Sequence, residues 1–153
     1  MKKYIKLHIC SLLILFFTTS IIAQNIQVHE MIGKKQGDVI KTYGNPVHKD
    51  NSDPTMMCMF YKTNISTMIF VADANGIYQA EATKTLDTEK DTRKEIDMFI
   101  SSSLETGFNV DTVTTLDFHL HKTGIKVDLQ MNENKLSNKY DIRVKANKTE
   151  DWK

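Results

Sequence analysis

The stretch that decides the fold is MMCMFYKTNISTMIFVADANGIYQAEATKTL, at residues 56–86. Three runs within it, 56–62, 65–72 and 77–85, alternate between two faces or are dense in β-branched and aromatic residues. Because successive side chains on a strand point to opposite faces, such runs predict β-strands. The run DANG at 73–76 predicts a hairpin turn between the second and third strands. These residues therefore predict a three-stranded antiparallel unit.

The C-terminal part of the chain has the same character. Three more runs with a period of two predict further strands, at 113–121, 124–131 and 138–146. Thr123-Gly124 and the polar run 132–135 separate these strands as turns. The segment 47–55, which is mostly polar, is predicted to be a turn region.

Two amphipathic helices are predicted outside the strands. The first covers about 35–43 and ends at Gly44, because Pro46 prevents the helix from continuing. The second covers about 88–106, where apolar side chains recur on one side at helical spacing: Ile96, Phe99, Ile100 and Leu104. Residues 26–34 have two open interpretations, an extended edge or a short helix.

These elements predict an α+β fold in the order helix, three strands, helix, three strands. Alternating strands offer one apolar face, which two helices can cover while the other face meets water. We therefore expect an antiparallel sheet of about six strands, covered on one face by two helices. The order of elements repeats at an offset of about 60 residues. Halves at 26–86 and 87–147 thus have two open interpretations, a tandem repeat or a chance similarity.

The N-terminus has the features of a bacterial secretory signal peptide. Lys2, Lys3 and Lys6 precede an apolar stretch at 9–17, and Ala23 offers a small residue for cleavage. The alternative is an uncleaved membrane anchor, but the apolar stretch is shorter than the roughly 20 residues that span a bilayer. We therefore expect export, either to the periplasm or out of the cell.

Cleavage would divide the chain into a signal peptide at 1–23, a single α+β domain at 24–147 and a flexible tail at 148–153. Without the signal, the chain carries a formal net charge of about −2, with both signs mixed along its length. This balance does not favour nucleic acid or an anionic membrane surface as a partner. No membrane insertion is expected after cleavage.

The chain has two cysteines. Cys10 lies at the start of the apolar stretch, where it is not placed for lipid attachment, and it leaves with the signal. Cys58 is then alone, so no disulfide is expected within the chain. Its neighbours Met56, Met57 and Met59 favour a buried small side chain over a reactive thiol.

One signature resembles known families. It consists of a glycine, a short helix with an acidic residue before valine, a Gly-x-Pro exit and a strand with an aromatic pair, carried by Ile32-Gly33, Asp38-Val39-Ile40, Tyr43-Gly44-Asn45-Pro46 and Met59-Phe60-Tyr61. It resembles the small periplasmic lipoprotein E subunit of the outer-membrane β-barrel assembly machine, and it is similar to the tandem-repeat β-lactamase inhibitor proteins. The resemblance implies helices packed on an antiparallel sheet, and binding or scaffolding rather than catalysis. The chain departs from the first family in having no lipidation site and from the second in having no disulfide.

The candidate metal ligands are His119 and His121. They lie two residues apart on a predicted strand, so their side chains point to the same face and can reach one ion. A third ligand would have to come from His29, His48, Asp117 or elsewhere, because the spacing specifies none. The alternative is a pair of solvent-facing histidines on the open side of the sheet, with their neighbours turned to the core.

Two other groups suggest metals only superficially. The run MMCM at 56–59 offers soft ligands for copper(I), but on a strand these residues alternate between faces and cannot converge. The acidic run DNSD at 50–53 suggests calcium, but it lacks the glycine and closing glutamate of a calcium-binding loop. We expect core packing from the first, a turn from the second, and no bound cofactor.

No catalytic motif is recognisable in the sequence. It has no nucleophile elbow, phosphate-binding glycine loop, zinc-protease helix or nucleotide fingerprint. We therefore expect no catalytic residues and no enzyme activity. The expected function is that of an exported module that binds another protein through the open face or an edge of the sheet. The alternatives are a metal-binding protein that uses His119 and His121, and an unrecognised hydrolase.

Overall fold

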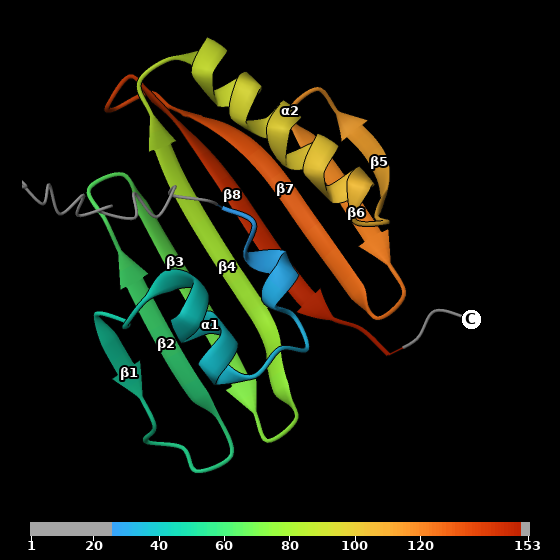
Figure 1. The fold of residues 1–153 in the computed structure, drawn as a ribbon. Helices are drawn as coiled ribbons and strands as arrows, with labels where there is room; N and C mark the ends of the chain where they lie inside the picture. Colours follow the sequence, from blue (N-terminus) through green and yellow to red (C-terminus); the bar gives the residue numbers. More distant parts are fainter. Residues whose placement is uncertain (1–25, 151–153) are drawn as a thin grey trace, which may run out of the picture.

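The computed structural model describes residues 26–150, so the signal peptide predicted at 1–23 lies outside the described residues. The described chain forms a short 3-10 helix, two α-helices and eight strands (Figure 1). In chain order these are η1 Val28–Met31, α1 Gln36–Tyr43, β1 His48–Asp50, β2 Met57–Lys62, β3 Ser66–Asp73, β4 Gly76–Leu86, α2 Glu89–Glu105, β5 Asn109–Thr114, β6 Asp117–Lys122, β7 Ile125–Asn134 and β8 Lys139–Lys148.

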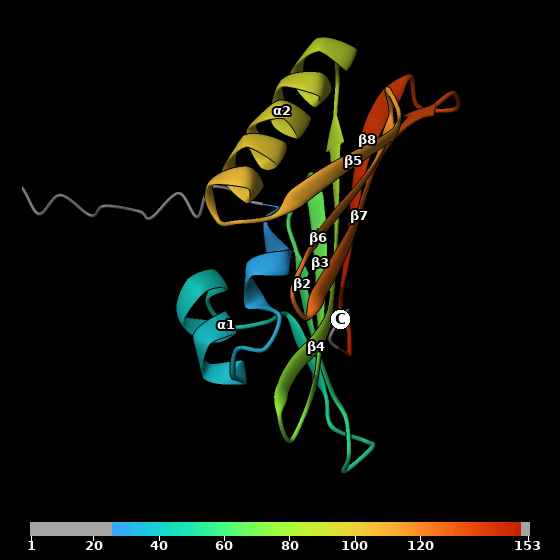
Figure 2. The same ribbon diagram turned by 90° about the vertical axis from the view of Figure 1, so that its right-hand side faces the viewer.

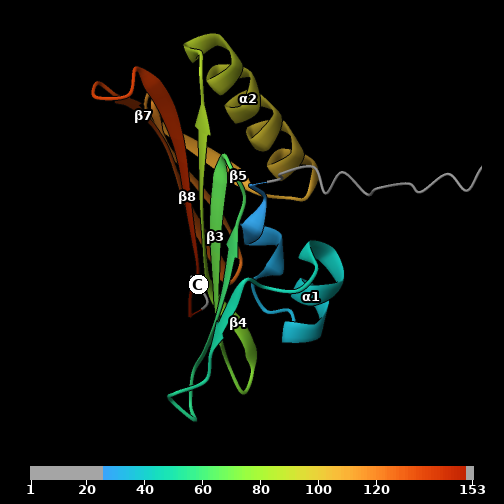
Figure 3. The ribbon, with the colours of Figure 1, turned by 90° about the vertical axis from the view of Figure 1, so that its left-hand side faces the viewer.

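The eight strands of the described residues belong to one antiparallel sheet, in the order β1-β2-β3-β4-β8-β7-β6-β5. β1 to β4 form one meander and β5 to β8 form another, and the two meet where β4 pairs with β8. Figures 2 and 3 show η1, α1 and α2 on the same side of the sheet. No described element covers the other side. The fold is therefore α+β, with one layer of helices on one layer of strands.

The expected count of about six strands is wrong, and so is the expected order of three strands after each helix. Four strands follow each α-helix. β1 lies within the region 47–55 that the sequence predicts to be a turn. No strand is predictable there, because the three residues of β1 are polar and exposed and give no apolar alternation. The predicted strand 113–121 merges the end of β5 with most of β6, which are separate strands joined by a turn at 115–116. Both missed strands lie at the sheet edges, where few side chains are buried.

The two α-helices begin and end within one residue of the bounds that the sequence predicts. α2 follows Thr88, whose hydroxyl oxygen accepts a hydrogen bond from a backbone amide in the first turn. Its inner face buries Ile96 and Phe99. Lys84 of β4 and Glu95 of α2 form a largely buried ion pair at 2.7 Å, which holds the helix against the sheet.

The segment before α1 contains a 3-10 helix, so the short-helix interpretation of 26–34 is the correct one. Ile26 and Val28 are at most 2 % exposed. η1 lies against β4 and β8 in the middle of the sheet. Ala80 and Ala146 are fully buried on these strands, and their small side chains leave room for the segment.

The junction between η1 and α1 is held against the turn between β3 and β4. The amide of Gly33 donates to the Ile77 carbonyl at 2.7 Å, and the amide of Ile77 donates to the Lys34 carbonyl at 2.9 Å. Gly76 has a φ of +131°, and a Cβ atom placed on it would lie 2.6 Å from the Lys34 carbonyl oxygen. Glycine is therefore required for this close approach of two backbone segments.

We predict that Gly76→Ala destabilises the fold by about 2 kcal/mol or more, because the added methyl group forces the two backbones apart. Gly37→Ala is the matched control, since nothing lies within 4 Å of that position. Alanine in α1 is expected to stabilise the protein by up to about 1 kcal/mol. Urea unfolding followed by circular dichroism measures both changes. Equal stability of the two variants would contradict the close approach.

Candidate functional site

The face of the sheet opposite the helices carries a row of side chains that crosses all eight strands. Strand register places them next to one another from edge to edge: His48, Phe60, Ile69, Glu81, Lys145, Asp128, His119 and Asp111. We call this set the central row. Met59, Ala82 and Leu120, which adjoin members of the row in sequence, are buried on the helix side. The alternation of each strand therefore places the central row on the open face.

The half of the central row that runs from β4 to β5 is charged. Lys145 Nζ lies 3.4 Å from Glu81 Oε1, and His119 Nδ1 lies 2.7 Å from Asp128 Oδ1. Lys126 Nζ approaches the same Asp128 oxygen at 3.6 Å. Because these side chains stay partly exposed to water, each pair contributes at most about 1 kcal/mol to stability. Their main effect is to set a fixed pattern of charge on the surface.

The other half of the central row is apolar. Phe60 and Ile69 are half-buried, and the His48 ring lies beside the Phe60 ring with centroids 5.6 Å apart. Cys58, one row away, extends this apolar surface. The sequence predicts that Cys58 is buried in the core, and this prediction is wrong: Cys58 is half-buried on the open face. Burial, and to a lesser extent the Asp50 carboxylate, raises the pKa of the Cys58 thiol, which disfavours the reactive thiolate.

His119 and His121 lie on the same face of β6, and each contacts a carboxylate. The partner of His121 is Asp111, whose Oδ2 lies 3.5 Å from the imidazole Nδ1. The other suggested ligands are dispersed, with His29 buried on the helix side, His48 on β1 at the far edge and Asp117 at the start of β6. Within residues 26–150, no group of three or more His, Cys, Asp or Glu side chains is arranged to hold a metal. The geometry places two partly exposed histidines on the open face, each beside a carboxylate.

The core packing expected of 56–59 holds only for Met59, and the turn expected of 50–53 begins at the last residue of β1. Met59 is fully buried in the core, whereas Cys58 lies on the opposite face, so the soft ligands do not converge. The carboxylates of Asp50 and Asp53 each accept a hydrogen bond at 2.8 Å from the amide two residues further on. The Ser52 amide lowers the pKa of Asp50, and the Thr55 hydroxyl, together with the Thr55 amide, lowers the pKa of Asp53. These local hydrogen bonds also close tight turns.

Within residues 26–150, the Ser103 Oγ and His29 Nε2 atoms come within hydrogen-bonding distance of each other, at 3.2 Å. Both side chains are fully buried, and the Ser103 hydroxyl donates to the Phe99 carbonyl at 2.8 Å. A catalytic nucleophile must reach its substrate and give its proton to the base. This pair meets neither requirement, so it offers no hydrolase site.

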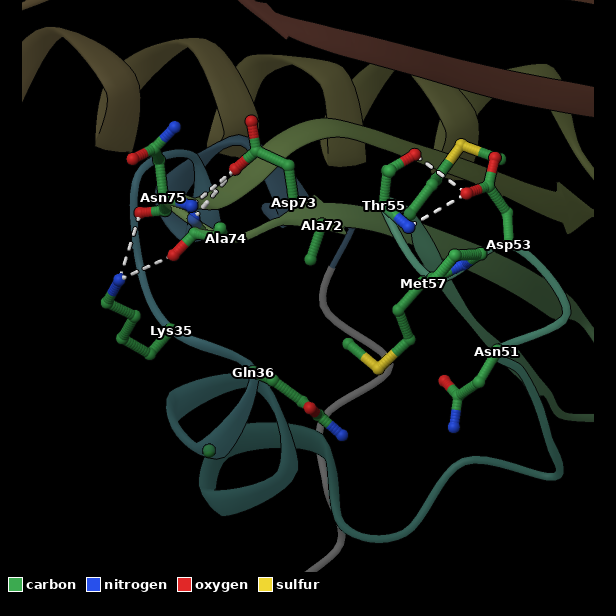
Figure 4. A pocket seen from close by; sticks show the side chains of 14 residues that line it. Lys35, Gln36, Asn51, Asp53, Thr55, Met57, Ala72, Asp73, Ala74 and Asn75 are labelled. Carbon is green, nitrogen blue, oxygen red and sulfur yellow. Dashed lines mark hydrogen bonds between the residues drawn. The ribbon is translucent and has the colours of Figure 1, made fainter.

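A hollow of about 740 Å³ lies between the start of α1, the loop before β2 and the turn after β3 (Figure 4). Met57 projects into it, while Lys35 donates hydrogen bonds to the carbonyls of Ala74 and Asn75 at 3.3 and 3.2 Å. The carboxylates in its wall accept hydrogen bonds within their own turns. Sequence reasoning missed this hollow because three distant segments build it. The charged groups Lys35, Asp53 and Asp73 in its wall are all engaged in hydrogen bonds.

Two further hollows lie along the charged half of the central row. One of about 600 Å³ adjoins His119 and His121, and one of about 470 Å³ adjoins Glu81 and Lys145. His119 and Lys126 contribute to the walls of both. The charged half of the open face is therefore a grooved surface, while its polar groups remain accessible.

Comparison with known proteins places few constraints on this chain. No protein-family model matches it, and no curated protein matches it. Solved structures similar to it include a cysteine-rich secretory protein from Staphylococcus aureus, with 11% identity and a TM-score of 0.38. Another is an extracellular protein containing an SCP domain from Bacillus anthracis, with 9% identity and a TM-score of 0.35. Each similarity covers 75% of this chain and 44% of the other, so the chain spans less than half of their length.

These comparisons correct the resemblance drawn from the sequence. The matched structures are secretory and SCP-domain proteins rather than the assembly-machine lipoprotein or the β-lactamase inhibitors. The signature failed because its parts are generic. Gly44 adopts a φ of +79° after α1, and Pro46 then prevents further helix, as happens at many helix ends. A Gly-x-Pro exit therefore marks the end of a helix and does not identify a family.

Proposed function

We propose that this chain is an exported, non-catalytic module that binds another protein through the open face of its sheet. The observation that carries the proposal is the central row, an ordered line of side chains across all eight strands. Its two halves differ in chemistry, since Phe60 and Ile69 are apolar whereas Glu81, Lys145 and Asp128 are charged. No element within residues 26–150 shields this row from a partner.

The dimensions of the open face support a protein as the partner. Neighbouring strands lie about 4.8 Å apart, and each residue advances a strand by about 3.3 Å. One face of a sheet of eight strands of moderate length therefore has an area of roughly 800 Å². One partner in a standard protein–protein interface contributes about 800 Å². Small-molecule sites are instead concave and enclose most of their ligand.

The chemistry of the central row also supports a protein partner. Binding energy in protein interfaces comes mainly from a few desolvated side chains, with aromatic residues prominent among them. Phe60 is half-buried in the free chain and sits beside Ile69 and His48, so it can serve as such an anchor. The alternating charges of Glu81, Lys145 and Asp128 would then select the orientation of a partner with the complementary pattern.

The proposed location is the periplasm or the outside of the cell. It rests on the basic and apolar pattern of residues 1–23. In the part of the chain that the structure describes, no helix is both long and apolar enough to cross a membrane. The matched solved structures are themselves described as secretory or extracellular.

We predict that a photo-crosslinking amino acid at Ile69 or Lys126 captures the same partner when the full chain is expressed in its native host. Both positions lie on the open face. Met98 is the matched control, since it is half exposed but lies on α2, on the helix side. Mass spectrometry of the adducts identifies the captured protein. Equal or stronger capture from Met98 would overturn the proposed surface.

The charge pattern gives a second prediction, which needs no partner. Lys145→Glu places a third carboxylate between Glu81 and Asp128, so it is expected to destabilise the fold by about 1 kcal/mol at low salt and by less in 1 M NaCl. Arg143→Glu makes the same change on the same strand, but its cross-strand neighbours are Thr83 and Gln130. Urea unfolding at both salt concentrations compares the variants. If Arg143→Glu destabilises the fold as much at low salt, the charge pattern is not what matters.

A further inference from the structure

His29 is fully buried on the helix side of the sheet, away from the open face. The Ser103 hydroxyl uses its one proton to donate to the Phe99 carbonyl, so it can only accept from His29 Nε2. This assigns the proton of the neutral imidazole to Nε2. Nδ1 is then a bare acceptor, and it has no hydrogen-bond partner among the described residues. One side of the imidazole is therefore satisfied and the other is not.

Aromatic rings form the walls around this imidazole. The Phe99 ring lies 4.7 Å from it between centroids, and the Phe108 ring lies 5.0 Å from it in an edge-on arrangement. Lys122 of β6 places its ammonium group 4.8 Å from the Phe108 ring centroid. A proton on Nδ1 would therefore create a buried charge with no acceptor, near an existing positive charge.

The other charged and titratable groups on this side do not compensate such a charge. α2 faces His29 with Phe99 and Ser103, and its carboxylate at Glu95 is already paired with Lys84. Within η1 itself, Glu30 is exposed to solvent. The neighbouring α1 contributes Tyr43. Burial raises the pKa of Tyr43, so its hydroxyl stays neutral at every pH considered for His29. Burial, reinforced by Lys122, accordingly lowers the pKa of His29 to about 4.

The segment that carries His29 is attached unequally at its two ends. Downstream, Gly33 and Lys34 are fixed to β4 by backbone hydrogen bonds in both directions with Ile77. Upstream, residues 26–32 are held through side chains: Ile26 and Val28 are buried in the core, and the polar contacts with α2 are His29 with Ser103 and Gln27 with Ser102 at 3.0 Å. Gly33 adopts a φ of +79°, which gives the chain a turn between the two parts.

We propose that residues 26–32 form a proton-controlled latch, which protonation of His29 releases from α2 and the sheet while Gly33 and Lys34 hold it to β4. Release lets the imidazolium reach water, which the closed structure denies it. It also uncovers the apolar surface of Phe99 and Phe108. The latch lies on the opposite side of the sheet from the central row, so this proposal is independent of the proposed function.

The direction of the pH effect follows from the two protonation states. A released His29 has the ordinary pKa of about 6.5, whereas the closed segment lowers it to about 4. The closed state is therefore fully favoured above pH 6.5, and it loses stability as the pH falls from 6.5 towards 4. Between pH 7.5 and pH 4.5, the equilibrium for release is expected to rise roughly 70-fold.

Hydrogen–deuterium exchange of the full chain, corrected for intrinsic rates, tests the latch. We expect the protection of amides in residues 28–32 to fall roughly 70-fold between pH 7.5 and pH 4.5. Amides of β7 report global unfolding, which also frees His29, so their protection is expected to fall by at least a similar factor but to stay well above that of the latch at both pH values. Unchanged protection in the latch at pH 4.5, or protection factors in the latch as high as those in β7, would overturn the proposal.

Two variants distinguish the effect of His29 protonation from the effect of its side-chain packing. His29→Gln cannot take up a proton, so the pH dependence of latch protection is expected to disappear. His48→Gln is the matched control, because it removes an exposed histidine on β1 and should leave the dependence intact. If His29→Gln fails to fold, the imidazole signal of His29 in the wild-type protein provides the test by NMR. Titration of the folded protein near pH 6.5 instead of below about 5 would end the proposal.

Discussion

The pairing of β4 with β8 is the interaction on which the rest of the structure depends. It runs from Gln79 opposite Asn147 to Leu86 opposite Tyr140, and it joins two meanders that share no other strand pairing. A four-stranded meander with one helix has little apolar area to bury by itself. The 3-10 segment rests on both β4 and β8, so it packs fully only when the two strands are joined. The central pairing thus turns two small units into one core.

The same pairing gives the sheet two faces of opposite character. On the helix side the central positions are small, with Ala80 and Ala146 fully buried, while larger side chains such as Phe70 and Leu129 flank them. The small side chains of Ala80 and Ala146 leave room for η1, which packs against β4 and β8. On the open side the central positions are Glu81 and Lys145, which are long and charged. The register that buries one set of residues therefore necessarily presents the other.

The parts of this structure that the sequence predicts are those with local signals. The inner strands and the two α-helices follow from apolar periodicity and end at turn residues. β1 and most of β5 bury few side chains, so nothing in their composition distinguishes them from loops. The contact between Glu81 and Lys145 joins positions far apart in the chain, and it depends on strand order, which local pattern does not encode. His119 and His121 were predictable as a pair on one face, but their carboxylate partners were not.

His29 illustrates why the helix side is more than a hydrophobic layer. Leaving a buried nitrogen without a partner costs about 1–3 kcal/mol, which is a large share of the 5–15 kcal/mol by which folded domains are stable. Ring contacts with Phe99 and Phe108 offset part of that cost. η1 packs behind β4 and β8, the two strands that carry Glu81 and Lys145 on their other side. The segment that carries His29 therefore lies directly behind the middle of the open face.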